Sequence, residues 1–187
     1  MDAFSYLTVL FSIILGLAIQ QILQGVRVWV LARDRVAFHA PTAIWCGLLL
    51  LIDVQSWWAT FGLRDHSEWS FGVFLLLIAH VSVLYMVSGL TLPDFPSGER
   101  IDLEEHFLRQ RGWFYGLIIL AVLLSVLKDV VLDGQLPEAR NLGFHGLFAA
   151  LALTGIVSRR PWAQLAVSLA VAAAVAAYVI LLFPRLQ

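Results

Sequence analysis

The sequence predicts an all-α, polytopic transmembrane helical bundle of about six spans. Of its 187 residues, 60% are apolar and 13% are charged, whereas a soluble globular domain carries about 45–50% apolar and about 25% charged residues. The mean hydropathy is +0.85, and apolar runs long enough to cross a bilayer as helices recur from Phe4 to Phe183. These runs leave no stretch for a soluble domain and far exceed the strands of about 9–11 residues in a membrane barrel. A single transmembrane domain over residues 1–187 is therefore predicted.

Six spans are predicted at roughly residues 4–30, 42–63, 70–92, 112–132, 142–158 and 161–183. The first has an acidic start and ends in glutamines instead of a small-residue cleavage site, so it is interpreted as a retained helix and not as a signal peptide. Charged residues, prolines and glycines separate the spans. Asp102, followed three residues later by Glu105, is typical of an N-cap with a capping-box partner, so the fourth helix is expected to begin near residue 102.

The cations predict an orientation. Most arginines fall at the end of the bundle that holds the first, third and fifth connections: Arg27, Arg33, Arg35, Arg100, Arg109, Arg111, Arg159 and Arg160, against Arg64, Arg140 and Arg185. The positive-inside rule then places these connections in the cytoplasm and both termini outside it. Tryptophans are expected in two interfacial belts, with Trp57, Trp58 and Trp69 outside and Trp29, Trp45, Trp113 and Trp162 inside.

Two ionisable residues lie near the middle of predicted spans. Asp53 has no neutralising group at helical spacing in its own span, and a charge near the bilayer centre costs at least about 2.5–3.5 kcal/mol. It is expected to be hidden from lipid by protonation, by another helix or by a water-filled cavity. His80 lies at a similar depth in the third span, so the two residues are expected to be able to meet. Their contact would be either a proton- or ion-sensitive pair or a hydrogen bond that locks two helices.

A polar stripe runs along the first span. Thr8, Ser12, Gly16, Gln20 and Gln24 recur at intervals of four residues and share one side of the helix. Small and amide-bearing residues favour close helix packing and interhelical hydrogen bonds, so the stripe is not expected to face lipid. Alternatively, the stripe lines a polar pore at a symmetry axis. Gln20 and Gln24 therefore join Asp53 and His80 as candidates for an ion or solute path, and the other three are candidates for packing.

Lys128 and Asp129 lie in the outer part of the fourth span, and Lys128 is the one lysine in the chain. A lysine in a span can form a retinal Schiff base or carry a proton. At this depth, however, a long side chain also reaches the interface, and this interpretation is favoured.

At the opposite end, a polar cluster is formed by Asp102, Glu104, Glu105 and His106. It is interpreted as a solvated turn, because a metal site would need ligands that converge from several loops, and no metal is predicted. Cys46 has no second cysteine and is interpreted as a packing residue. The chain contains no phosphate-binding glycine loop, nucleophile elbow or zinc-protease helix, so no cofactor is predicted. A net charge of -1 without blocks of like charge does not indicate a nucleic-acid partner.

Three segments carry a family resemblance. Phe4-Ser5-Tyr6-Leu7 with Ser12 to Ile19, Gln55-Ser56-Trp57-Trp58, and the stretch from Asp102 to Phe114 resemble an uncharacterised family of small bacterial polytopic membrane proteins. The resemblance extends over the whole chain and implies a bacterial inner-membrane location. It implies no activity, cofactor or catalytic residue.

The sequence as a whole favours a homo-oligomeric channel or transporter-like protein for a small ion or solute, with a path near Asp53 and the Gln20/Gln24 face, over an enzyme. One alternative is a structural or sensory membrane subunit that acts through an unidentified protein partner. Another is an intramembrane lipid-modifying enzyme, which would need polar groups that converge at a cleft. Membrane lipids are expected partners in each case.

Overall fold

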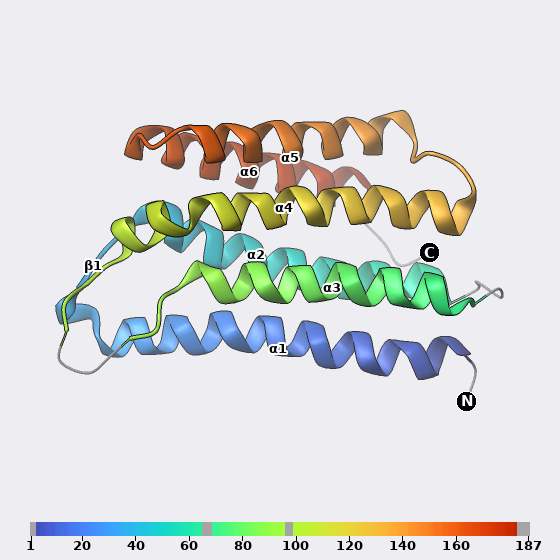
Figure 1. The fold of residues 1–187 in the computed structure, drawn as a ribbon, viewed down its shortest axis with the longest axis horizontal. Coiled ribbons are helices and arrows are strands. Elements are labelled where there is room, and N and C mark those ends of the chain that lie inside the picture. The colour runs from blue at the N-terminus through green and yellow to red at the C-terminus, as the bar shows by residue number, and fades with distance from the viewer. Residues whose placement is uncertain (1–2, 65–68, 96–98, 183–187) are drawn as a thin grey trace.

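A computed structural model describes residues 3–64, 69–95 and 99–182, and these form a bundle of six long helices (Figure 1). The helices are α1 Ala3–Leu31, α2 Ala40–Thr60, α3 Phe71–Thr91, α4 Leu103–Asp133, α5 Ala139–Val157 and α6 Pro161–Leu182. All six are long and apolar enough to cross a membrane. The predicted all-α polytopic bundle is therefore confirmed. The predicted breaks at residues 65–68 and 96–98 and the end of the sixth span at residue 183 lie outside the described residues.

The helices run side by side and alternate in direction (Figure 1). The start of α1 lies at the same end of the bundle as the ends of α2 and α4, and this end is called the N-terminal end below. Helix α3 packs against both α1 and α4, α5 packs against α4 and α6, and α6 packs against α2. This arrangement leaves the interior of the bundle bounded mainly by α2, α3, α4 and the α5–α6 pair.

A short ladder joins two connections at the opposite end, which is called the ladder end. Strand β1 (Val36–Ala37) follows a 3-10 turn and pairs in parallel with β2 (Ile101–Asp102), with Val36 opposite Ile101. The Arg35 guanidinium donates to the backbone carbonyl of Glu99 at 2.9 Å beside this pair. No strand was predicted, because two residues are too few to show an alternating pattern. The ladder ties the α1–α2 connection to the α3–α4 connection.

The start of α4 follows from its cap. The Asp102 carboxylate accepts hydrogen bonds from the backbone N–H groups of Glu104 at 2.8 Å and Glu105 at 3.1 Å, which satisfies donors that the first helical turn leaves free. The predicted start of the fourth helix is confirmed. Helix α4 ends at Asp133 and is capped by Gly134, whose φ of 68° is a left-handed conformation that favours glycine. With 31 residues, α4 extends well beyond the predicted span 112–132 at its first end.

His39, at the ladder end just before α2, is buried against α4. Its Nδ1 lies 2.9 Å from Thr42 Oγ1, and its ring centroid lies 5.4 Å from that of Phe107. Burial lowers the pKa of His39 from its ordinary 6.5, although the nearby carboxylates of Glu104 and Asp102 oppose the shift. The first turns of α2 and α4 are therefore packed together around an imidazole for which the buried site favours the neutral form.

Trp45 was expected in an interfacial belt, and the structure shows this to be wrong. Its side chain is buried in the core, whereas Trp113 and Trp162, expected in the same belt, are exposed. The indole ring of Trp45 lies edge-on to the rings of Phe114 and Tyr115, with centroids 4.9 and 5.8 Å apart. The position of a residue along a predicted span does not reveal which side of the helix it lies on. Trp45 lies on the side of α2 that faces the interior of the bundle.

Candidate functional site

A cavity of about 140 Å³ lies within the bundle and is bounded by α2, α3, α4, α5 and α6. Most of its wall is aliphatic or aromatic. Towards the N-terminal end, the wall carries amide, hydroxyl and imidazole groups. Each of the five helices contributes one or two of them, and they are Gln55, Ser56, His80, Ser125, His145 and Tyr178. A largely apolar cavity with a few convergent polar groups is the usual form of a small-molecule site.

A second cavity of about 80 Å³ continues towards the N-terminal end. The residues that line both cavities are Gln55, Ser56, His80, Ser125 and Tyr178. The second cavity is also lined by Thr60, Leu63 and Lys128, which lie near the ends of α2 and α4. The polar residues therefore mark the boundary between the two spaces, and the pair leads from the middle of the bundle towards its N-terminal end.

His80 on α3 presents an unpaired nitrogen at this boundary. Its Nδ1 is buried and has no hydrogen-bond partner among the described residues. The backbone of Ala121 on α4 lies beside the other side of the ring, where the tautomer with the hydrogen on Nε2 places a donor towards a backbone carbonyl. In the neutral ring, Nδ1 is then a free hydrogen-bond acceptor.

His145 on α5 and Ser125 on α4 are paired across the cavity wall. His145 Nδ1 lies 2.9 Å from the backbone carbonyl of Asn141, and its Nε2 lies 3.1 Å from Ser125 Oγ. Because a carbonyl only accepts, Nδ1 carries the hydrogen, and in the neutral ring Nε2 accepts from the Ser125 hydroxyl. This pair is already satisfied within the protein, in contrast to His80.

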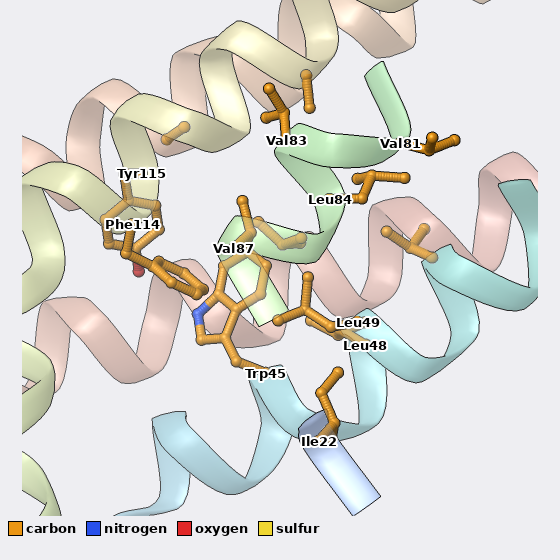
Figure 2. Packing of buried hydrophobic residues seen from close by; sticks show 14 of the residues in the cluster. Ile22, Trp45, Leu48, Leu49, Val81, Val83, Leu84, Val87, Phe114 and Tyr115 are labelled. Carbon is orange, nitrogen blue, oxygen red and sulfur yellow. The ribbon is translucent and has the colours of Figure 1, made fainter. Parts of the chain in front are cut away.

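An aromatic cluster lies at the side of the cavity towards the ladder end. Figure 2 shows Trp45 turned towards Phe114 and Tyr115, with Leu49 and Val87 beside it. The rings of Phe114 and Tyr115 are perpendicular, with centroids 5.3 Å apart. Edge-to-face rings at such distances attract each other beyond the effect of burial alone. Trp45 and Tyr115 also line the cavity, so this cluster forms part of its wall towards the ladder end.

Gln164 on α6 holds Tyr115 in place. The Tyr115 hydroxyl donates to Gln164 Oε1 at 2.9 Å. The Gln164 amide nitrogen donates to the backbone carbonyls of Gly155, at 2.9 Å, and Ser158. Gly155 on α5 lies directly against the Tyr115 ring, and a Cβ at this position would overlap the ring carbons. Three helices therefore fix the position of one tyrosine.

Asp53 lies between α2 and α3, away from both cavities. It has no exposed surface, and its Oδ2 accepts a hydrogen bond from Ser88 Oγ at 3.3 Å. Its Oδ1 is buried without a partner among the described residues. Asp53 is absent from the described linings of both cavities. Asp53 is thus concealed by protein, but it does not lie on the route that His80 lines.

Asp53 and His80 are not brought together, which corrects the expectation from their similar depth. The partner of Asp53 on α3 is Ser88, and eight residues of helix, or roughly 12 Å at 1.5 Å per residue, separate Ser88 from His80. His80 is directed towards α4 instead. The depth of a residue was counted from the predicted end of its own span. This count ignores how far α2 and α3 are shifted along each other, and this shift decides which residues meet.

The polar stripe of α1 faces outward in the single chain, so the expectation that it is hidden from lipid stays a prediction. Ser12, Gly16, Gln20 and Gln24 are exposed, and Thr8 is half-buried. The opposite side of α1 is buried and carries larger apolar residues, namely Phe11, Leu15, Ala18 and Ile22. These residues bury more apolar area against α2 and α3 than the stripe would, which accounts for the orientation of α1.

The stripe has few hydrogen bonds of its own. Gln20 Nε2 donates to Gln24 Oε1 at 3.4 Å, and Ser12 Oγ accepts from the Trp57 indole at 3.2 Å. Thr8 donates to the backbone carbonyl of Phe4 at 3.0 Å. The amide nitrogen of Gln24 has no hydrogen bond to any described residue. The predicted path near Gln20, Gln24 and Asp53 is therefore divided between an outer face and the interior.

The structure also places the remaining candidates. Lys128 Nζ lies 3.2 Å from Asp129 Oδ1, and both side chains are partly buried. Lys128 lines the second cavity, so its side chain contributes to the interior, and its reach to the membrane interface stays a prediction. At the ladder end, His106 Nε2 lies 3.2 Å from the carbonyl of Leu90. Asp102 caps α4, so these two residues of the predicted cluster serve to fix the α3–α4 connection.

Within residues 3–64, 69–95 and 99–182, no group of three or more His, Cys, Asp or Glu residues is placed to hold a metal ion. Cys46 is a free, buried thiol.

Sequence reasoning identified His80 but missed the residues around it. Gln55, Ser125, His145 and Tyr178 lie in different helices, and no spacing within one helix relates them. The available signal was only that each interrupts an apolar run.

No protein-family model matches this chain, and neither a curated protein nor a solved structure matches it. The resemblance to a family of small bacterial membrane proteins therefore stays a prediction.

Proposed function

We propose that this six-span membrane protein is a transporter-like protein that takes a small solute into the cavity between α2 and α6. The observation that carries the proposal is the convergence of polar groups from five helices at one end of an otherwise apolar cavity. The second cavity supplies an approach from the N-terminal end, and the Trp45–Tyr115 cluster blocks the ladder end. The path thus runs through His80 instead of Asp53.

The proposed setting is a bacterial inner membrane with the N-terminal end outside. The arginines of the first, third and fifth connections favour the ladder end in the cytoplasm under the positive-inside rule. In this orientation the cavities admit solute from the extracytoplasmic side, and the aromatic cluster separates it from the cytoplasm.

Filling the cavity tests this proposal. Ala152 on α5 is buried and lines the cavity, whereas Ala150 on the same helix is exposed. Ala152→Leu is expected to weaken saturable binding of 4-fluorophenol at least about tenfold, because the longer side chain occupies the space that the probe needs. Ala150→Leu adds the same atoms on the outside and is the matched control.

Binding is measured by fluorine NMR on the purified protein in nanodiscs, with empty nanodiscs to subtract partitioning into lipid. Saturable binding that Ala152→Leu abolishes and Ala150→Leu retains supports the proposal. A wild-type protein that binds neither 4-fluorophenol nor 4-fluorotoluene beyond the empty nanodiscs would contradict it.

The outer face of α1 supports a second part of the proposal, namely that copies of the chain associate through this face. The stripe places two amide side chains on a surface otherwise suited to lipid, with one hydrogen bond between them. An amide both donates and accepts, so the stripe of a second copy is chemically complementary to it. Glycine and serine in the same stripe allow two helices to approach closely.

Cysteine cross-linking tests this association. In a Cys46→Ala background, single cysteines replacing Ser12, Gly16, Gln20 or Gln24 are expected to form interchain disulfides in membranes. The reason is that disulfides need Cα atoms about 4.4–6.8 Å apart. Leu153→Cys, on the exposed side of α5, is the control and is expected to remain monomeric on a gel. Equal cross-linking at residue 153, or none at any stripe position, would exclude α1 as the contact.

A further inference from the structure

We propose that the cavity recognises a neutral, ring-sized apolar molecule that carries a hydroxyl group, the chemistry of a phenol or a hydroquinone, and that the hydroxyl donates to His80 Nδ1. This inference deepens the proposed function and rests on it. It follows from the charge, the size and the unpaired acceptor of the cavity.

The wall of the cavity favours a neutral ligand. None of its described lining residues is Asp, Glu, Lys or Arg. The nearest lysine, Lys128, lines the second cavity and is paired with Asp129. A charged group transferred into an apolar site without an opposite charge would lose its hydration with little compensation. A fixed charge on the ligand is therefore disfavoured.

The size and lining of the cavity favour one ring. A volume of about 140 Å³ is close to that of an engineered apolar cavity of about 150 Å³ that binds benzene in another protein. Aromatic side chains from four helices, Trp45, Tyr115, Phe148 and Tyr178, contribute to the wall. Such rings offer both faces and edges to an aromatic guest.

The polar group of the ligand is assigned from what the protein leaves unpaired. Ser125 donates to His145, whose other nitrogen is bound to the Asn141 carbonyl. Two buried ring nitrogens of the wall have no partner among the described residues: His80 Nδ1 towards the N-terminal end, and the donor Trp45 Nε1 towards the ladder end. The Ala121 backbone lies beside the other side of the His80 ring, which leaves Nδ1 as the acceptor among the convergent polar groups. A buried acceptor of this kind calls for a donor. A hydroxyl on the ring supplies one, whereas an ether or a methyl group does not.

The test compares two probes of nearly equal shape. 4-Fluorophenol and 4-fluorotoluene differ in a hydroxyl against a methyl group, and binding of each is measured by fluorine NMR on the full chain in nanodiscs. The wild type is expected to prefer 4-fluorophenol by about three- to tenfold, after correction for partitioning into lipid, which is the effect of one neutral hydrogen bond. His80→Leu is expected to lose the preference and still bind 4-fluorotoluene.

Two further variants serve as controls. His106→Leu removes a histidine at the ladder end that lines neither of these cavities and is expected to keep the preference. His80→Asn retains a hydrogen-bond acceptor at the cavity and is expected to keep part of it. Both also separate a general effect of losing an imidazole from the loss of the acceptor.

The outcomes separate the two proposals. Equal binding of both probes by the wild type overturns the assignment of a hydroxyl and leaves the binding cavity intact, as would be the case if water satisfied His80. Binding of neither probe overturns the cavity function itself. If His80→Leu does not fold, the comparison of the two probes in the wild type still decides.

Discussion

Gly155→Val is expected to lower the stability of the bundle by about 3 kcal/mol, at the upper end of the range for overpacking a core. A Cβ on Gly155 would overlap the ring of Tyr115. Tyr115 has no room to retreat, because Trp45 and Phe114 stand edge-on to its ring and Gln164 holds its hydroxyl. The added atoms must therefore push α5 away from α4.

Gly146→Val is the matched control for this substitution. Gly146 lies on the same helix, and a Cβ there would meet no atom within 4 Å. Unfolding is measured as a function of denaturing detergent in mixed micelles, and the two midpoints are compared. If the steric account holds, Tyr115→Ala combined with Gly155→Val costs less than the sum of the two single changes. Equal midpoints for the two valine variants would show that the contact between α4 and α5 yields easily.

Gln164→Leu is expected to cost about 2 kcal/mol. The substitution leaves the Tyr115 hydroxyl without its acceptor and removes the donor to the carbonyls of Gly155 and Ser158. A buried polar group left unpaired costs about 1–3 kcal/mol in soluble proteins. Hydrogen bonds between membrane helices average only about 0.6 kcal/mol. The substitution removes three such hydrogen bonds, so the expected loss of stability is about three times this average.

Gln110→Leu on α4, which is half-buried towards the ladder end, is the comparison for losing a glutamine in general. The same detergent titration is used, and hydrogen exchange at the α5–α6 turn reports whether the loss is local. Gln164→Leu should also weaken the binding of 4-fluorophenol, since Tyr115 is part of the cavity wall. A stability equal to that of the wild type would mean that the three hydrogen bonds contribute no net free energy.

The fold followed from the sequence because long apolar runs permit few structures in lipid. All six spans and the start of α4 at Asp102 were predicted, the latter from a local pattern of side chain and backbone. The ladder of Val36 and Ile101 was not predicted, because it depends on two connections meeting at one end of the bundle. Local sequence patterns carry no information about contacts between segments that are distant in the sequence.

The site was only partly predictable for the same reason. Asp53 and His80 stood out as polar residues in apolar runs, yet their helix neighbours and not their depth decide what they touch. The sequence did not reveal that the stripe of α1 lies on the outer side of the single chain, because small residues and large apolar residues both pack well. The larger buried area of Phe11 and Leu15 decided the orientation.

In the proposed transporter, the Trp45–Tyr115 cluster that blocks the ladder end has a kinetic consequence. A cavity that opens at one end only cannot conduct solute continuously. A solute molecule that enters it must leave through the same opening until the other end opens. Net movement would therefore proceed one molecule per conformational cycle, and its rate would level off as solute concentration rises. Because Tyr115 is hydrogen-bonded to Gln164 on α6 and packed against Gly155 on α5, the rearrangement that opens the ladder end would have to displace the α5–α6 hairpin as a unit.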